Sequence, residues 1–151
     1  MKKLITLITI ITTFAAIPGR ASTPEQEKAF IDGYRTALEA GDAKALNAFL
    51  STDGAEADTV EFFKMMQTPE PGAKVVSIEL VKPTAEEEVK FNAPMMMPDG
   101  KTYKMPVKPF KQLVIKLETK SENGSSSSTS KSPVAEKGGK LVIPVPVLAK
   151  K

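Results

Sequence analysis

The side chains that most often carry acid–base chemistry are missing from this sequence. It contains no histidine and no cysteine, which excludes imidazole catalysis and a thiol nucleophile. Its two tyrosines, Tyr34 and Tyr103, fall on predicted core faces, from which their hydroxyls could reach a pocket. A buried ring with its hydroxyl at the rim is the simpler interpretation. Asp32 and Glu79 are candidate carboxylates, but the spacing pairs neither of them with a second catalytic group.

Methionine is the other residue type that could do chemistry here. The sequence contains seven methionines, with three in a row at 95–97, and thioethers are ligands that Cu(I) accepts in proteins. On a strand, however, Met96 points away from Met95 and Met97. We therefore interpret the methionines as adaptable filler of a core or an apolar pocket, and we expect neither a metal nor a cofactor.

The first half of the chain is predicted to form helices, which would position Tyr34 and its apolar neighbours. Thr23 and Gln26 have the spacing of a capping box around Pro24, and apolar residues then recur at helical spacing. Gly41 ends this helix, and Asp42 can cap a short second one. A third helix is expected from about Asp58 to Gln67. The apolar residues that we place on the core side of the first helix are Phe30, Tyr34, Ala37 and Leu38.

A β-hairpin is predicted around Pro98-Asp99-Gly100. Proline at the second position and glycine at the fourth position of the turn fit a three-residue loop that pairs Met97 with Lys101. In this register apolar residues meet apolar residues on one face, whereas a two-residue loop would mix the two faces. The cross-strand pairs expected from this register are Met95 with Tyr103, Ala93 with Met105, and Phe91 with Val107.

Period-two patterns predict the remaining strands. Val76, Ile78 and Leu80 indicate one strand, and another should run through 103–117 with a bulge or bend near Pro109 that turns Lys111 outward. The serine-rich stretch 121–132 is expected to be a flexible loop. Residues 141–147 are expected to form the last strand. Because Pro144 and Pro146 lack N–H groups on the same side, we expect this strand at a sheet edge, beside the strand that contains Leu113–Leu117.

Two stretches resemble the nuclear-transport-factor-like superfamily, which has a cone-shaped α+β, cystatin-like fold. They are residues 34–50, with a Gly-Asp break between two helices, and residues 136–143, Glu-Lys-Gly-Gly-Lys-Leu-Val-Ile. An aromatic residue often follows the Gly-Lys pair in that superfamily, but here Leu141 and Val142 stand in its place. The resemblance implies N-terminal helices packed on a curved antiparallel sheet of about four strands, with a pocket in the cone. It does not select a function.

The N-terminus and the charges limit the location and the partners. Residues 1–21 have the pattern of a signal peptide, with Lys2 and Lys3, an uncharged apolar run, and Gly19-Arg20-Ala21 before a cut at Ser22. A secreted or periplasmic location without a membrane anchor follows from this interpretation. The remaining chain, residues 22–151, has 18 basic and 18 acidic side chains. This balance argues against a nucleic-acid partner, because phosphate binding needs a basic surface.

Together these patterns favour one exported, non-enzymatic α+β domain with a modest apolar pocket that binds a small apolar ligand or a protein partner. The candidate pocket residues are Tyr34, Phe91, Met95, Tyr103 and Met105. One alternative is an interaction or homodimerisation module that uses the outer face of the sheet. The other is an isomerase-like or hydrolyase-like enzyme, which would require a buried carboxylate near Tyr34 or Tyr103.

Overall fold

The computed structural model describes residues 22–69, 71–97, 99–121 and 124–149, and this part of the chain forms an α+β fold, as expected. The predicted signal peptide lies outside the described residues. The helices are α1 (Pro24–Glu39), α2 (Ala43–Asn47), α3 (Ala57–Gln67) and α4 (Ala85–Asn92). The strands are β1 (Leu50–Ser51), β2 (Ala73–Val81), β3 (Met95–Met96), β4 (Thr102–Lys104), β5 (Lys111–Ser121), β6 (Gly124–Lys137), β7 (Lys140–Pro144) and β8 (Val147–Leu148).

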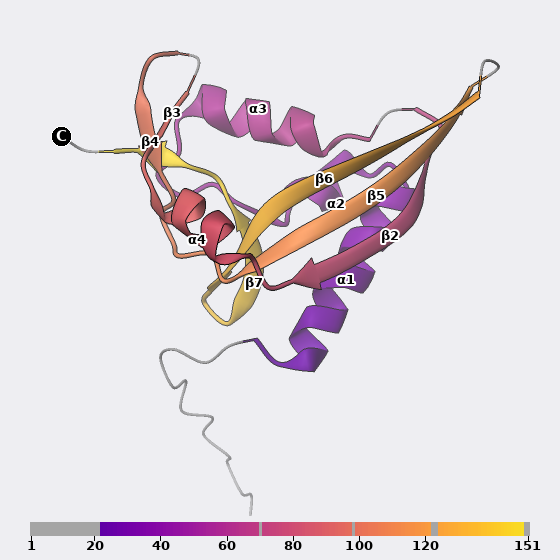
Figure 1. The fold of residues 1–151 in the computed structure, drawn as a ribbon, viewed down its shortest axis with the longest axis horizontal. Helices are drawn as coiled ribbons and strands as arrows, with labels where there is room; N and C mark the ends of the chain where they lie inside the picture. Colours follow the sequence, from indigo (N-terminus) through magenta and orange to yellow (C-terminus); the bar gives the residue numbers. More distant parts are fainter. Residues whose placement is uncertain (1–21, 70, 98, 122–123, 150–151) are drawn as a thin grey trace, which may run out of the picture.

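The described strands form two sheets rather than a single sheet of about four strands. The larger sheet has the order β1-β7-β6-β5-β2, and the smaller sheet has the order β3-β4-β8. All the pairs are antiparallel except β1 with β7, which is parallel. In Figure 1, α1 and α2 lie behind the larger sheet, α3 lies beyond β6, and α4 lies in front of the sheet. The chain passes from the larger sheet to the smaller one between β7 and β8.

Local signals at its start give α1 its predicted position. The Thr23 hydroxyl accepts a hydrogen bond from the Gln26 N–H, and the Gln26 side chain accepts one from the Thr23 N–H, which completes the capping box. Gly41 follows the helix with a φ of 63°, a value that glycine adopts without strain. The Asp42 carboxylate then accepts the Ala45 N–H and starts α2.

The hydrophobic core lies between α1, α2 and the inner face of the larger sheet. The rings of Phe30 and Tyr34 on α1 both pack against Phe49, with centroid distances of 5.2 and 5.1 Å. In β2, a register shift between Val75 and Ser77 separates Val76 from the face of Ile78 and leaves it 60% exposed. The buried residues of the core cluster are Phe30, Tyr34, Ala37, Leu38, Leu46, Leu50, Ile78, Leu113, Ile115, Val134, Leu141, Ile143 and Val145.

The predicted hairpin register is confirmed over a short length. Met95 pairs with Tyr103, and the Met97 N–H donates to the Lys101 carbonyl at 3.0 Å. Gly100, with a φ of 76°, closes the loop by donating its N–H to the Met97 carbonyl at 2.9 Å. Pro98 lies outside the described residues. The hairpin does not extend to the expected pairs of Ala93 with Met105 and of Phe91 with Val107.

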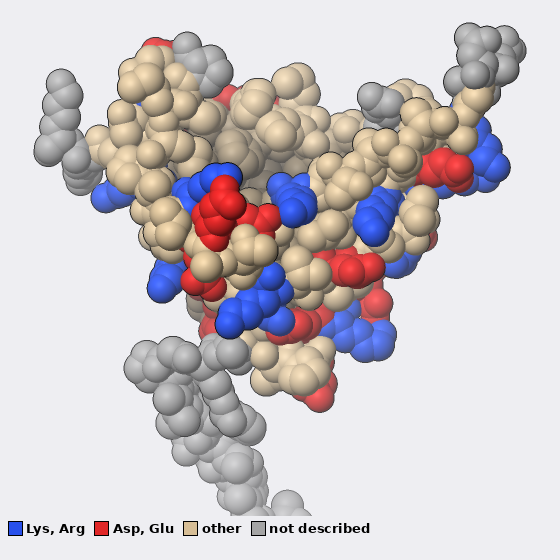
Figure 2. Space-filling model, viewed as in Figure 1, with Lys and Arg blue, Asp and Glu red and all other residues tan. Residues whose placement is uncertain are grey.

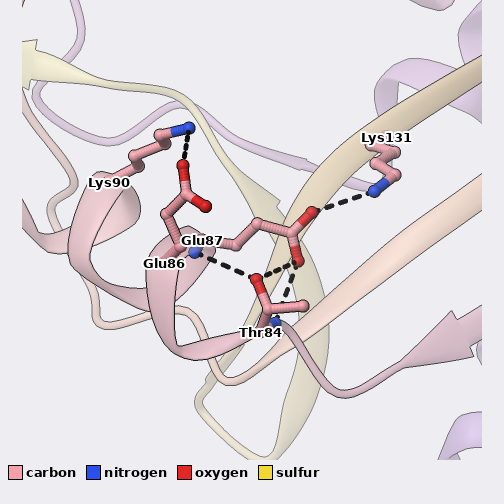
Figure 3. A network of polar contacts seen from close by, with 5 residues as sticks. All are labelled: Thr84, Glu86, Glu87, Lys90 and Lys131. Carbon is pink, nitrogen blue, oxygen red and sulfur yellow. Dashed lines mark hydrogen bonds and ion pairs between the residues drawn. The ribbon is translucent and has the colours of Figure 1, made fainter.

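The prediction that the first strand of the hairpin extends back to Phe91 is wrong, because residues 85–92 form α4. Thr84 and Glu87 make a second capping box: the Thr84 hydroxyl accepts the Glu87 N–H at 3.2 Å, and the Glu87 carboxylate accepts the Thr84 N–H at 2.9 Å. The acidic side chains in the first turn interact favourably with the positive end of the helix dipole and so stabilise α4. Glu87 also forms an ion pair with Lys131 of β6 at 2.9 Å, which attaches α4 to the sheet (Figure 3).

The strand predicted through 103–117 is divided between the two sheets. Its first part is β4 and its second part is β5, and the connection contains Pro106 and Pro109. The proline therefore marks a complete interruption of the strand rather than a bend. Lys111 does not turn fully outward. Its side chain is 25% exposed, and its ammonium group lies 3.1 Å from the Glu27 carboxylate on α1.

The serine-rich stretch is not a loop where the structure describes it. Residues 124–132 belong to β6, which pairs with β5 along its length, with Ile115 opposite Ser130 and Leu113 opposite Ser132. The two residues between the strands, 122 and 123, lie outside the described residues. β5, which is rich in β-branched and apolar residues, supplies a long partner, and pairing with it overrides the weak strand propensity of serine.

The expected edge position of the last strand is also wrong. The Ile143 N–H donates to the Phe49 carbonyl and the Val145 N–H donates to the Ser51 carbonyl, at 2.8 and 3.0 Å, so β7 lies inside the sheet. Its other neighbour is β6 rather than β5. Pro144 and Pro146 are fully buried. Their missing N–H groups coincide with the place where β7 separates from β6, because that pairing covers only Ala135–Lys137 of β6.

Candidate functional site

A pocket of about 410 Å³ opens between the helices and the larger sheet. Figure 2 shows a hollow between the β3–β4 hairpin and the tip of the β5–β6 hairpin, in front of α3, while charged side chains of both signs lie over α4 and the outer sheet face. The residues that line the pocket are Tyr34, Leu38, Phe63, Met66, Gln67, Thr68, Pro69, Ala73, Met95, Met105, Ile115, Leu117, Thr119, residues 128–133, Ile143 and Pro146.

The structure brings three of the five predicted pocket residues together. Tyr34 of α1, Met95 of β3 and Met105 line the pocket. Tyr103 and Phe91 do not. Tyr103 is buried elsewhere, with 2% exposure, and Phe91 lies half-buried on α4. The two outcomes differ because Met95 belongs to the part of the hairpin that forms, whereas Phe91 was placed on a strand that is a helix.

The pocket has an apolar side and a hydroxyl-bearing side. Tyr34 and Leu38 of α1, with Phe63 and Met66 of α3, provide apolar surface. The opposite side follows β6, where consecutive residues 128–133 all contribute. On the inner face of β6, Ser128, Ser130 and Ser132 lie opposite Leu117, Ile115 and Leu113 of β5. Sequence reasoning missed this side, because alternating serines define a face only once the segment is known to be a strand.

The pocket offers little acid–base chemistry. Tyr34 and Lys131 are its titratable lining residues in the described part of the chain. Burial raises the pKa of Tyr34 to about 12, so the phenol stays protonated at neutral pH, and its oxygen lies 3.5 Å from the Gln67 side-chain oxygen. Lys131 is held by its ion pair with Glu87. A ligand here would therefore meet mostly neutral surface, with hydroxyl groups from Tyr34 and from the serines of β6.

A separate polar cluster surrounds Tyr103. Its hydroxyl oxygen lies 2.6 Å from a Glu56 oxygen and 2.8 Å from an Asp99 oxygen, and the Lys101 ammonium lies 3.1 Å from Glu56. A phenol carries one proton, so it donates to one carboxylate at a time while the lysine offsets the second negative charge. Through these contacts Glu56, the N-cap residue of α3, links the helix to the β3–β4 hairpin.

The pKa values of Tyr103 and Glu56 are shifted in opposite directions, away from neutral pH. The hydrogen bonds to Glu56 and then Asp99 raise the pKa of Tyr103 to about 12. The hydrogen bond from Tyr103, followed by that from Lys101, lowers the pKa of Glu56. The carboxylates are therefore ionised and the phenol is neutral over the same wide range of pH. Neither residue type is poised as a general acid or base near neutrality.

The arrangement of the described acidic side chains does not point to a metal site. Within the described ranges, no group of three or more aspartate or glutamate side chains is arranged to hold a metal ion. Of the consecutive methionines, Met95 lines the pocket whereas Met96 is 77% exposed, as strand alternation predicted.

Comparison with known proteins adds a distant structural likeness. No family model matches the chain, and no curated protein matches it. The structure is similar to that of the helical cell shape determining protein Pgp2 from Campylobacter jejuni, with 14% sequence identity and a TM-score of 0.43. The match covers 78% of this chain and 38% of that protein. None of the helices in the described residues is both long and apolar enough to cross a membrane.

Proposed function

We propose that this protein is a non-enzymatic binding domain whose pocket takes an uncharged, largely apolar ligand, either a small molecule or a segment of a protein. The observation that carries the proposal is the composition of the lining: no carboxylate lines the pocket in the described part of the chain, and the ammonium group of its one lysine, Lys131, is paired with Glu87 of α4. A volume of about 410 Å³ falls within the usual range for ligand pockets.

The position of the pocket agrees with this proposal. It lies between the N-terminal helices and the sheet, where the resemblance to the nuclear-transport-factor-like superfamily implies a cone. Met66, Met95 and Met105 line it. Methionine side chains are flexible and polarisable, so they adapt to ligands of different shape.

Two adjacent methionines allow a controlled test. Met95→Trp would place a bulky ring in the pocket, whereas Met96→Trp places the same ring on the exposed opposite face of β3. Binding of the neutral fluorescent probe N-phenyl-1-naphthylamine should be lost in the first variant and retained in the second. Equal binding by both variants, or no binding by the parent protein, would show that the pocket is not a ligand site.

The two alternative functions receive less support from the described residues. A sheet-mediated dimer needs a flat apolar outer face, but that face carries Lys116 opposite Ser77, and Glu118 opposite Lys74. An enzyme needs a carboxylate inside the pocket, whereas Glu56 and its partner Tyr103 lie outside it.

We also propose that the protein is exported and cleaved before Ser22. The apolar run and Gly19-Arg20-Ala21 support this, and the α1 capping box begins one residue after the proposed cut. The intact mass of the protein recovered outside the cytoplasm tests the proposal. A mass that includes residues 1–17 would contradict it.

A further inference from the structure

We propose that the ligand is an extended peptide segment with bulky apolar side chains. It adds to the larger sheet as a strand along residues 125–133 of β6. The inference rests on the proposed binding function and names the class of ligand. Its basis is a strand position in the sheet, beside β6, that none of the described strands occupies where β7 leaves the sheet.

The vacancy arises where β7 leaves the sheet. β6 pairs with β5 from Gly124 to Val134, but it pairs with β7 only from Ala135 to Lys137. Over residues 125–133, β6 therefore has one strand neighbour among the described residues. Its other side lines the pocket, facing Phe63 and Met66 of α3. A strand side without a partner is a template for a further strand.

The direction of the backbone groups follows from the hairpin that joins β6 to β7. Lys137 and Lys140 flank a two-residue turn in which Gly138 and Gly139 have φ values of 58° and 77°. Residues that flank such a turn exchange hydrogen bonds, so the N–H and C=O groups of Lys137 point toward β7. By alternation, the groups of Thr129 and Lys131 point to the same, vacant side.

A second observation agrees with this alternation. The Val134 carbonyl accepts the Phe110 N–H at 3.0 Å, which places the backbone of an even-numbered residue on the β5 side. It also explains why Thr129 and Lys131 line the pocket although their side chains belong to the outer face. Their backbone groups provide the polar surface there.

The inner face suits a peptide with large apolar residues. Ser128, Ser130 and Ser132 are small, so they leave room beside β6 for the side chains that an added strand would project inward. Those side chains would contact Phe63, Met66 and Met105. An acyl chain would cover the same apolar surface but would leave the backbone groups of β6 without partners, which is costly once water is excluded.

The probe is an acetylated and amidated pentapeptide of sequence Leu-Thr-Leu-Thr-Leu, and its binding to the full chain is measured by calorimetry. Methylation of all its backbone nitrogens keeps the side chains and removes the donors. We expect the methylated peptide to bind at least about tenfold more weakly, because each lost hydrogen bond costs about threefold to tenfold. Decanamide represents acyl ligands.

Proline scanning tests the geometry within the protein. Thr129→Pro removes an N–H that points to the vacant side, so the fold should tolerate it while peptide affinity falls by about tenfold or more. Thr129→Ala keeps the N–H and should change affinity by less than about twofold. Ser130→Pro removes an N–H that points to β5, and its melting temperature should fall well below that of Thr129→Pro.

The outcomes separate the two proposals. Tighter binding of decanamide than of the peptide, abolished by Met95→Trp, would overturn the peptide assignment and leave the binding function intact. Equal effects of Thr129→Pro and Thr129→Ala would also overturn it, as would a concentration-dependent dimer that the peptide disrupts, because the natural occupant would then be a second copy. Failure of every probe, including the neutral dye, would overturn both proposals.

Discussion

Replacement of Leu113 by alanine tests the face assignment of β5 on which both the core and the pocket depend. Leu113 is 0% exposed and lies in the middle of the larger sheet, with Leu80 of β2 on one side and Ser132 of β6 on the other. Burial of a leucine side chain contributes about 1.5–3 kcal/mol. The cavity left by truncation adds to this loss, because neighbours held in sheet register relax only partly.

We therefore expect Leu113→Ala to lower the free energy of unfolding by about 3–5 kcal/mol. For a domain of this size, that loss corresponds to a decrease in melting temperature of about 10–20 °C. Urea unfolding at pH 7 measures the free energy. Lys116→Ala is the control, because Lys116 is exposed on the outer face of the same strand, where substitutions change stability by about 0.5 kcal/mol or less.

The comparison of these two variants gives a definite test. If Leu113→Ala and Lys116→Ala cost the same small amount, or if the lysine variant costs more, then β5 is shifted by one residue. A one-residue shift exchanges the two faces of a strand, and the wall of the pocket that β5 provides would then be polar.

Three further measurements address the polar contacts. Glu87 should titrate with a pKa of about 2 in a carboxyl NMR titration, because the backbone amide at the start of α4 and a lysine of β6 hold it ionised. This pKa lies below the ordinary value of 4.5, so the contribution of Glu87 to stability is present at neutral pH and is lost as the pH falls from about 4.5 to about 2. Tyr103→Phe should raise the pKa of Glu56, since it removes the strongest contact that lowers this pKa; an unchanged titration would show that the hydroxyl is not its donor. Glu27→Gln should cost about 1–2 kcal/mol in urea unfolding, because Lys111 would remain charged and half-buried; no loss of stability would mean that the pair does not form in solution.

The N-terminal helices could be predicted because their boundaries are set by neighbouring residues. Thr23 caps through Gln26, three residues away, and Asp42 caps through Ala45. The turn at Gly100 was predictable for the same reason, since loop length alone set the register of Met95 and Tyr103. α4 had an equally local signal in Thr84 and Glu87, but the alternating apolar residues after Glu88 favoured a strand.

The C-terminal strands could not be placed because their partners are remote in the sequence. Nothing near Ser130 indicates that Ile115 lies opposite it. Likewise, the two prolines at 144 and 146 show which side of the strand lacks donors, but they do not show that β1 pairs with the other side. Among the pocket residues, Tyr34, Met95 and Met105 could be predicted from the periodicity of apolar residues. The serines of β6 could not, because their shared face becomes apparent only once the segment is known to be a strand.

The parallel pairing of β1 with β7 has a consequence for how the chain folds. Leu50 follows directly after the first two helices, yet its strand partner is Ile143, close to the other end of the sequence. During synthesis from the N-terminus, α1 and α2 would emerge long before the strand that completes their side of the sheet. Contacts between remote segments form slowly, because loop closure must precede them. The helical half should therefore stay exposed to chaperones until the last strands emerge.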